Sequence, residues 1–239
     1  MTAPRLVVFD CDGTLADSQF AITSAMQTAF TACGLTAPAR ADVLAVVGLS
    51  LPIAIAKILQ AQNSSAQTFP KQACSETVNI AALAEAYKSA FKAQRAKAEF
   101  DEPLYPGIRE LLEKLAAQPE TLLGVATGKS MRGLRALLDR QNLTDLFTTL
   151  QTADTHPSKP HPAMLQAALT ETGAEPQHAM LVGDTVFDME MARACGVTAI
   201  GVSWGYHPAD DLTQSGARHV AHSADQLADV LMANLEPAR

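Results

Sequence analysis

The chain has 239 residues, of which 48% are hydrophobic and 18% are charged, so it carries enough apolar material for a buried core and is not globally disordered. It has 18 Lys and Arg against 25 Asp and Glu, a net charge of −7, and only 5% aromatic residues, which excludes the basic surface and stacking platforms that nucleic-acid binding needs. No apolar stretch approaches the roughly 18 residues of a membrane span, and no basic amphipathic segment favours a membrane surface. We therefore expect a small-molecule partner, with no nucleic acid and no membrane.

Strand-like and helix-like patterns alternate along most of the chain. A strand is predicted at 5–10, and a block from 18 to about 100 has helical periodicity at 20–33, 51–62 and 80–98 and no strand pattern. Alternation then resumes, with strands predicted at 121–126, 146–152, 179–183 and 197–202 and helices at 108–117, 130–141, 161–172, 186–195 and 224–234. Strand–helix–strand repeats with short connections indicate a parallel sheet covered by helices on both faces.

These patterns predict an α/β fold, a Rossmann-like parallel sheet core into which an all-helical domain is inserted. We expect the core to comprise residues 1–17 and 101–239 and the helical domain to comprise 18–100. Turn-forming residues mark both boundaries, with Asp17-Ser18 at the first and Pro103 and Pro106-Gly107 at the second. The sequence leaves a monomer and a homodimer equally open.

The cysteines and the N-terminus bear on the compartment. The four cysteines, Cys11, Cys33, Cys74 and Cys195, are scattered and show no zinc-site spacing, so we expect reduced thiols and a cytoplasmic location. The apolar run 6–9 stops at Asp10 and is too short for a signal peptide.

Two carboxylates follow the first predicted strand. Asp10 and Asp12 are two residues apart and precede Gly13-Thr14, so they flank one small volume at the strand end, where ligands of parallel α/β sheets bind. At that separation one carboxyl group tends to be protonated when the other is ionised, which suits one for nucleophilic attack and the other for acid/base work. An isolated D-x-D-G is more often only a turn.

A hydroxyl and free backbone amides follow the strand predicted at 121–126. Thr127, Gly128, Lys129 and Ser130 lead into a helix, and a helix N-terminus with a hydroxyl group favours anion binding. The same segment falls one residue short of a P-loop, because only three residues separate Gly124 from Gly128, so an NTPase is disfavoured. An ordinary helix cap by Thr127 or Ser130 is the alternative.

Two further segments complete the set. Lys159 lies among the prolines of Ser158-Lys159-Pro160-His161-Pro162, which restrict the backbone and can hold its ammonium group in place. Asp184 ends a strand and Asp188 lies one turn into the next helix, so both can face the acid of the first strand, an arrangement that suits Mg²⁺. Asp184 is also expected to cap that helix. Each of the four segments alone is a weak to moderate indication of a site. Because all four are predicted at strand ends and occur in this order, together they indicate one site.

These four segments resemble the motifs of the haloacid dehalogenase-like superfamily of phosphohydrolases, in particular members with a helical cap inserted just after the first motif. The matching residues are Asp10-x-Asp12-Gly13-Thr14, Thr127, Lys159 before Pro160, and Gly183-Asp184-x-x-x-Asp188. The resemblance covers essentially the whole chain. Tyr105-Pro106-Gly107 and the stretch 201–205 look most like phosphoglycolate phosphatases.

The resemblance implies a Mg²⁺-dependent phosphatase that forms an aspartyl-phosphate on a small phosphomonoester. Asp10 would attack phosphorus, while Asp12 would protonate the leaving alkoxide and then activate water. Thr127, Gly128 and Lys159 would bind the phosphate, and Lys159 would stabilise its charge. The implied metal ligands are Asp10, Asp184, Asp188 and the backbone carbonyl of Asp12.

The same residues also bear on which reaction of the superfamily this chain catalyses. Asp12 argues against dehalogenases and phosphonoacetaldehyde hydrolases, which lack an acid at that position. Sugar phosphomutases tend to carry a basic cap residue soon after a glycine equivalent to Gly48, where this chain has 49–52 Leu-Ser-Leu-Pro, so a mutase is the alternative within the superfamily. The 48–52 loop is itself a candidate for substrate selection.

Two alternatives lie outside the superfamily. Gly201-x-Ser203-x-Gly205 matches the G-x-S-x-G elbow of serine esterases, with Asp211 and His222 in the expected order, but 204–208 suggests a loop rather than the sharp turn the elbow needs. A non-enzymatic binding module is disfavoured because every catalytic position is filled.

Overall fold

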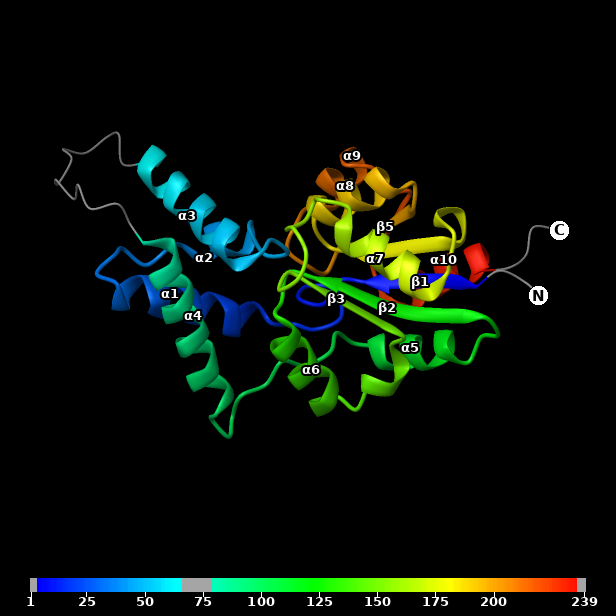
Figure 1. Cartoon of the computed structure of the whole chain (residues 1–239), viewed down its shortest axis with the longest axis horizontal. Coiled ribbons are helices and arrows are strands. Elements are labelled where there is room, and N and C mark those ends of the chain that lie inside the picture. Colours follow the sequence, from blue (N-terminus) through cyan, green and yellow to red (C-terminus); the bar gives the residue numbers. More distant parts are fainter. Residues whose placement is uncertain (1–3, 66–78, 236–239) are drawn as a thin grey trace.

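The computed structural model describes residues 4–65 and 79–235, and its centre is one parallel sheet. Six strands are ordered β3-β2-β1-β4-β5-β6 (Figure 1). Their bounds are β1 Arg5–Phe9, β2 Thr121–Thr127, β3 Thr149–Thr152, β4 Ala179–Gly183, β5 Thr198–Val202 and β6 His219–Ala221. Every adjacent pair is parallel, and Val8, for example, lies between Gly124 of β2 and Leu181 of β4. The predicted parallel α/β core is confirmed.

Helices cover both faces of the sheet. The helices of this core are α5 Ile108–Ala116, α6 Met131–Arg140, α7 Ala163–Thr172, α8 Val186–Cys195, α9 Ala209–Gln214 and α10 Ala224–Leu235. Alternate residues of β1 face opposite layers: Val7 and Phe9 pack with α5, α6 and α10, while Leu6 and Val8 pack with α7, α8 and α9. Because both faces are buried, the central strands are apolar throughout.

The remaining helices form a separate block beside the carboxyl ends of the strands (Figure 1). They are α1 Gln19–Ala32, α2 Arg40–Leu44, α3 Leu51–Ser65 and α4 Ile80–Arg95, and they share a hydrophobic cluster that includes Phe30, Ile55 and Leu83. Phe187 of α8 joins the same cluster, so the block is packed against the core rather than only tethered to it. We call residues 19–95 of this block the cap.

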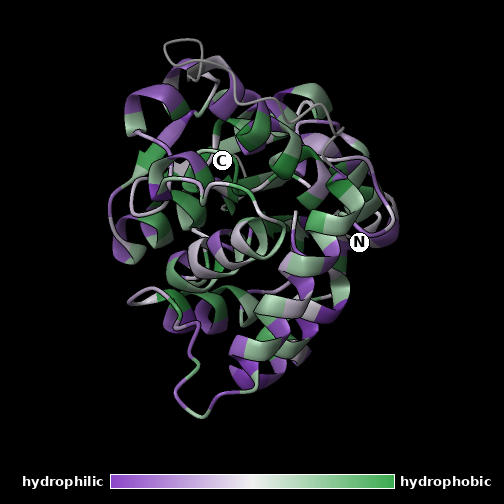
Figure 2. Ribbon diagram, turned by 90° about the vertical axis from the view of Figure 1, so that its left-hand side faces the viewer, coloured by the Kyte–Doolittle hydropathy of each residue, from purple (hydrophilic) through white to green (hydrophobic). Residues whose placement is uncertain are grey.

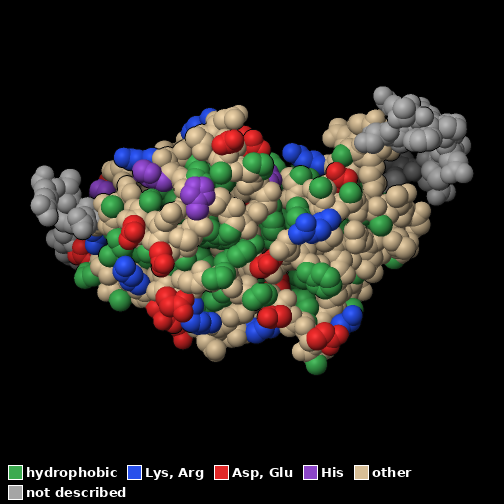
Figure 3. Space-filling model, turned by 180° about the vertical axis from the view of Figure 1, so that it is seen from behind, with side chains coloured by type: hydrophobic (Ala, Val, Ile, Leu, Met, Phe, Trp, Pro, Cys, Tyr) green, Lys and Arg blue, Asp and Glu red, His purple; other side chains and the backbone are tan. Residues whose placement is uncertain are grey.

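The hydrophobic residues follow this layered arrangement. Figure 2 shows apolar residues on the strands and on the inward faces of the helices, with hydrophilic residues on the outer faces. Seen from behind, the molecule narrows between the core and the cap (Figure 3). In the described part of the chain, no helix combines the length and the apolarity needed to cross a membrane.

The structure differs from the predicted elements mainly in short segments. The sequence patterns missed α2, α9 and β6, each of six residues or fewer, which are too short to show a periodicity. The strand predicted at 146–152 begins only at Thr149, because Thr144–Leu146 forms a 3-10 turn. Cys11 is buried and Cys33 and Cys195 are also free thiols, whereas the prediction for Cys74 falls outside the described residues.

Candidate active site

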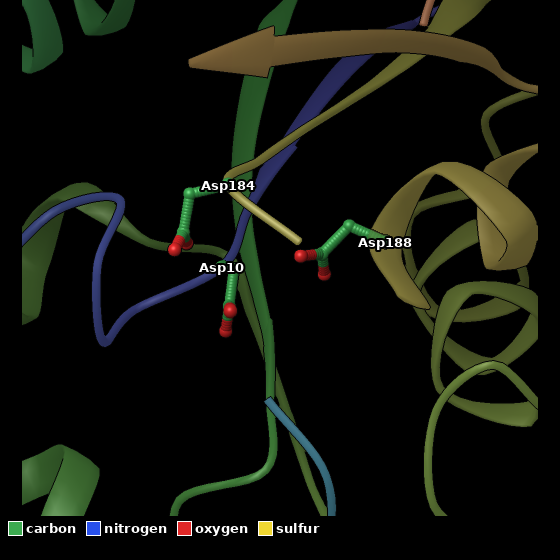
Figure 4. Close-up of side chains that lie close together, drawn as sticks. All are labelled: Asp10, Asp184 and Asp188. Carbon is green, nitrogen blue, oxygen red and sulfur yellow. The ribbon is translucent and has the colours of Figure 1, made fainter. Parts of the chain in front are cut away.

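Three carboxylates meet where β1 and β4 end. Asp10 follows β1, Asp184 follows β4 and Asp188 lies in the first turn of α8 (Figure 4). Each offers an oxygen atom within 4.8 Å of the others, and all three side chains are fully buried. β1 and β4 are neighbours in the sheet, which is why residues 174 positions apart in sequence reach the same point.

Asp184 is held by two hydrogen bonds and enclosed by glycines. The Thr14 hydroxyl donates to Asp184 Oδ1 at 2.7 Å, and the backbone N–H of Tyr206 donates to Oδ2 at 2.9 Å. A Cβ atom on Gly13 would lie 2.3 Å from Asp184 Oδ2, and one on Gly205 would lie 2.2 Å from Asp184 Cβ. Gly13 also has a φ of +91°, so this close packing requires glycine there.

Asp188, and not Asp184, contributes to the cap of α8. Thr185 is the N-cap residue, its hydroxyl and its backbone N–H both donate to Asp188 Oδ2, at 2.6 and 3.1 Å, and the two residues form a capping box. The expectation that Asp184 caps this helix is therefore wrong. Thr185 takes that place, and the oxygen atoms of Asp184 instead accept the hydrogen bonds from Thr14 and Tyr206.

Lys159 brings a positive charge into the carboxylate cluster. Its Nζ lies 2.6 Å from Asp188 Oδ1 and 2.9 Å from Asp10 Oδ1, and its side chain is 0% exposed. A buried ammonium group needs such partners, because desolvation without them is costly. The structure thus places Lys159 beside Asp10, as the sequence predicts.

Burial and charge shift the proton affinities of this cluster. Burial raises the pKa of Asp10 to about 7, although the Lys159 ammonium opposes the shift. Burial also raises the pKa of Asp184 well above its ordinary value, and the charges of Asp10 and Asp188 act in the same direction. Burial disfavours the charged form of Lys159, but the two carboxylates beside it outweigh burial and raise its pKa. Three carboxyl groups face one ammonium group, so the cluster without a metal ion tends to hold protons that a cation would replace.

A divalent cation fits this donor set. Among the described residues, Asp10 Oδ2 is buried without a hydrogen-bond partner, so one hard oxygen atom of the cluster is left free. Asp184 contributes a second carboxylate beside it, and its oxygen atoms, like those of Asp188, also accept hydrogen bonds. Carboxylate oxygens are the ligands that Mg²⁺ prefers, and one or two of them suffice.

A cavity of about 720 Å³ lies over the cluster, between core and cap. Asp10, Asp12, Thr127 and Gly128 line it from the core, and the cap contributes the 48–52 loop and parts of α1 and α4. The cavity thus adjoins both the predicted nucleophile and the predicted phosphate-binding turn.

Residues 48–50 form a loop that contacts that turn directly, whereas Leu51 and Pro52 of the predicted 48–52 loop belong to the first turn of α3. A Cβ atom on Gly128 would lie 2.6 Å from the carbonyl oxygens of both Gly48 and Leu49. In addition, the backbone N–H of Ser50 donates to Ser158 Oγ at 2.8 Å, next to Lys159. The loop therefore reaches the core at the predicted phosphate-binding turn. Thr127 is buried there and its hydroxyl accepts from the N–H of Lys129 at 3.2 Å.

Asp12 lies at the edge of the site with a partner that the sequence patterns missed. Its Oδ1 is 2.6 Å from Lys129 Nζ, which is also 3.0 Å from Oε1 of the fully buried Glu102. Burial disfavours the charged form of Lys129, but Asp12 and Glu102 outweigh it and raise its pKa. The position of Lys129 directly after Thr127-Gly128 is a sequence signal for its place near the site. The sequence around Glu102 contains no motif that would predict its contact with Lys129.

The structure does not support the P-loop or the esterase alternative. The Lys129 ammonium is held by two carboxylates, whereas a P-loop lysine must be free for phosphate. Ser203 Oγ does lie 2.7 Å from His222 Nδ1, but Ser203 is followed by a loop that runs to Pro208, and α9 begins only at Ala209. The strand-to-helix turn of a nucleophile elbow is therefore missing at Ser203.

Comparison with known proteins adds independent findings. Residues 7–202 match the family model described as haloacid dehalogenase-like hydrolase. The chain is 35% identical over 209 residues to "Probable phosphatase IndB" of Dickeya dadantii strain 3937, covering 87% of this chain and 84% of that protein. It is 29% identical to the phosphoglycolate phosphatase of Pseudomonas putida KT2440, covering 86% and 72%.

Solved structures share the fold. The crystal structure of a "predicted phosphoglycolate phosphatase" from Haemophilus somnus 129PT superposes with a TM-score of 0.80 at 23% identity, over 98% of this chain and 99% of that one. The similarity extends over core and cap together.

Proposed function

The chain belongs to the haloacid dehalogenase-like hydrolases and is a phosphatase of that family, and we propose that it hydrolyses a small phosphomonoester through an aspartyl-phosphate on Asp10. The observation that carries the proposal is the placement of Lys159 between Asp10 and Asp188, two of the three clustered carboxylates. A nucleophile, a counter-charge for phosphate and a pair of metal-binding carboxylates thereby share one buried point.

Each site residue then has a part in the reaction. Asp10 attacks phosphorus, and Lys159 together with the Thr127–Gly128 turn balances the charge of the transferring phosphoryl group. Asp12 protonates the leaving oxygen and afterwards takes a proton from the water that hydrolyses the acyl-phosphate. Its position at the edge of the cavity, 7% exposed, supports this role.

The metal site would consist of Asp10, Asp184, the Asp12 backbone carbonyl and, through its charge, Asp188. We infer Mg²⁺ as the ion because the donors are all hard oxygen atoms. When bound, the ion would offset the negative charge of the phosphoryl group.

The cavity between cap and core is of a size that suits a small metabolite. Phosphoglycolate is the first candidate, because the relative from Pseudomonas putida carries that name. A phosphatase is favoured over a phosphomutase since residues 49–52, which line the cavity together with Gly128, have no basic side chain. We further propose that residues 18–100 form the cap domain on a core of 1–17 and 101–239, and that the enzyme works in the cytoplasm.

The proposal is tested by a screen of phosphorylated metabolites, including phosphoglycolate, with and without EDTA. Purified protein should release inorganic phosphate with Mg²⁺ and lose that activity on chelation. Asp10→Asn should be inactive yet folded, because an amide cannot attack phosphorus. A wild-type rate in the Asp10 variant, or a rate indifferent to EDTA, would refute the assignment.

A further inference from the structure

Beyond the four expected motifs, a buried charge network ends on Asp12. Lys129 Nζ bridges Asp12 Oδ1 and Glu102 Oε1, at 2.6 and 3.0 Å, and the side chains of these three residues are exposed by 8%, 10% and 0%. Glu102 Oε2 lies 3.6 Å from Arg95 and 3.7 Å from Arg140. The acid/base candidate is therefore one end of a chain of ion pairs that leads away from the site.

The network joins three parts of the molecule. Arg95 is the last residue of α4 in the cap, Arg140 is the last residue of α6 in the core, and Glu102 lies in the segment that connects cap and core. The Lys129 ammonium also lies 5.4 Å from the centre of the Phe91 ring on α4, a cation–π distance. Lys129 is thus held from both sides of the junction.

Asp12 depends on this contact for its orientation. In the described part of the chain, Lys129 is the one residue with a hydrogen bond to the Asp12 carboxylate. By contrast, Asp184 and Asp188 each have two or more such partners. A carboxylate that exchanges protons with substrate needs a fixed direction, since small misplacements of a reacting group lower rates steeply.

We propose that Lys129, itself fixed by Glu102, is a positioning residue that orients Asp12 for proton transfer to the leaving group. The inference rests on the proposed phosphatase function. Lys129 acts through Asp12 and leaves the binding of phosphate to Lys159 and the Thr127–Gly128 turn.

Leaving-group dependence distinguishes this role from a structural one. Phenyl phosphate and p-nitrophenyl phosphate are similar in shape, but phenolate is the poorer leaving group and needs more help from an acid. Lys129→Met should lower kcat/KM for phenyl phosphate about tenfold more than for p-nitrophenyl phosphate, within the range of general-acid contributions. Lys114→Met, at an exposed position on α5, is the matched control and should leave both values unchanged.

Lys129→Met leaves two carboxylates close together in a buried place, which could impair folding. The double variant Lys129→Met with Glu102→Gln removes one of those charges and should show the same selective loss. An equal loss on both substrates, or a raised KM with unchanged kcat, would overturn the inference and make Lys129 a structural or a substrate-binding group.

A crystal structure of the double variant tests the positioning separately from the activity. The Asp12 carboxylate should change its rotamer, while Asp10, Lys159 and Asp188 keep theirs. An unchanged Asp12 would refute the inference even if the wild type proved not to be a phosphatase, whereas an inactive wild type with a displaced Asp12 would refute only the proposed function.

Discussion

Lys159 shows at the scale of one residue how the site balances its charge. The ammonium group is enclosed between Asp10 and Asp188 and touches no solvent. Its role is therefore both electrostatic and structural, because without it the buried carboxylates face one another alone. A phosphate-binding lysine on the surface would lack the second role.

We expect Lys159→Met to lose activity and stability together. Catalysis should fall by about 10²–10³ in kcat, the usual effect of removing one charge-stabilising group. The free energy of unfolding should fall by roughly 3–5 kcal/mol, because one partner of a buried ion pair is gone. Urea unfolding and steady-state kinetics measure the two effects. A variant as stable as the wild type would contradict the packing described for Lys159.

At the scale of elements, a loop of the cap contacts the turn after β2 at the candidate site. Gly128 has no side chain where the carbonyl oxygens of Gly48 and Leu49 approach it. The hydrogen bond from Ser50 to Ser158 fastens the same loop to the segment that carries Lys159. Two segments of the core that carry predicted site residues thus meet one loop of the cap.

We expect Gly128→Ala to displace this loop. The added methyl group would lie 2.6 Å from two carbonyl oxygens, which cannot move without shifting the loop backbone. We expect kcat/KM to fall by up to about a hundredfold, as small misplacements of substrate-positioning groups can cause. Thermal unfolding serves as the control and should change little, because the loop lies outside the sheet core. Kinetics equal to the wild type would show that loop docking does not matter for turnover.

At the scale of the whole molecule, the carboxylate cluster links stability to pH and to metal. The folded state raises the pKa of Asp10 to about 7, from a value near 4 in the unfolded chain, and raises that of Asp184 as well. The metal-free folded protein therefore binds more protons than the unfolded chain between about pH 4 and pH 7. Its free energy of unfolding should fall as the pH rises through this window.

A divalent ion should reverse that loss. At pH 8, above the Asp10 pKa of about 7, Mg²⁺ meets an ionised Asp10, whereas at pH 5 it must displace a proton, so the thermal midpoint should rise more with Mg²⁺ at pH 8 than at pH 5. At a concentration of 100 times Kd the gain would be about 2.7 kcal/mol. Differential scanning calorimetry with and without MgCl₂ measures it, with Asp184→Asn as the variant that should respond less. Equal shifts at both pH values would argue against this cluster as the metal site.

The sequence alone determined the parallel core, the helical insertion and the residues of the four motifs. These features are local: buried strands are apolar runs, and Asp10, Thr127 and Asp184 lie at strand ends, although Lys159 lies further along the segment after β3. Asp10, Thr127, Lys159 and Asp184 could therefore be selected before their distances were known. The short elements α2, α9 and β6 could not, because their formation depends on packing rather than on pattern.

Only the tertiary structure decided which other side chains contact the motif residues. Thr185 is the helix cap in place of Asp184, Lys129 is paired with Asp12, and Glu102, from a segment with no motif, is paired with Lys129. Such contacts join residues that are far apart in sequence. The sequence around a single carboxylate or lysine does not indicate which distant residue will pair with it. They arise when the chain closes cap upon core and each buried charge must find an opposite one, because leaving it unpaired away from water costs too much free energy.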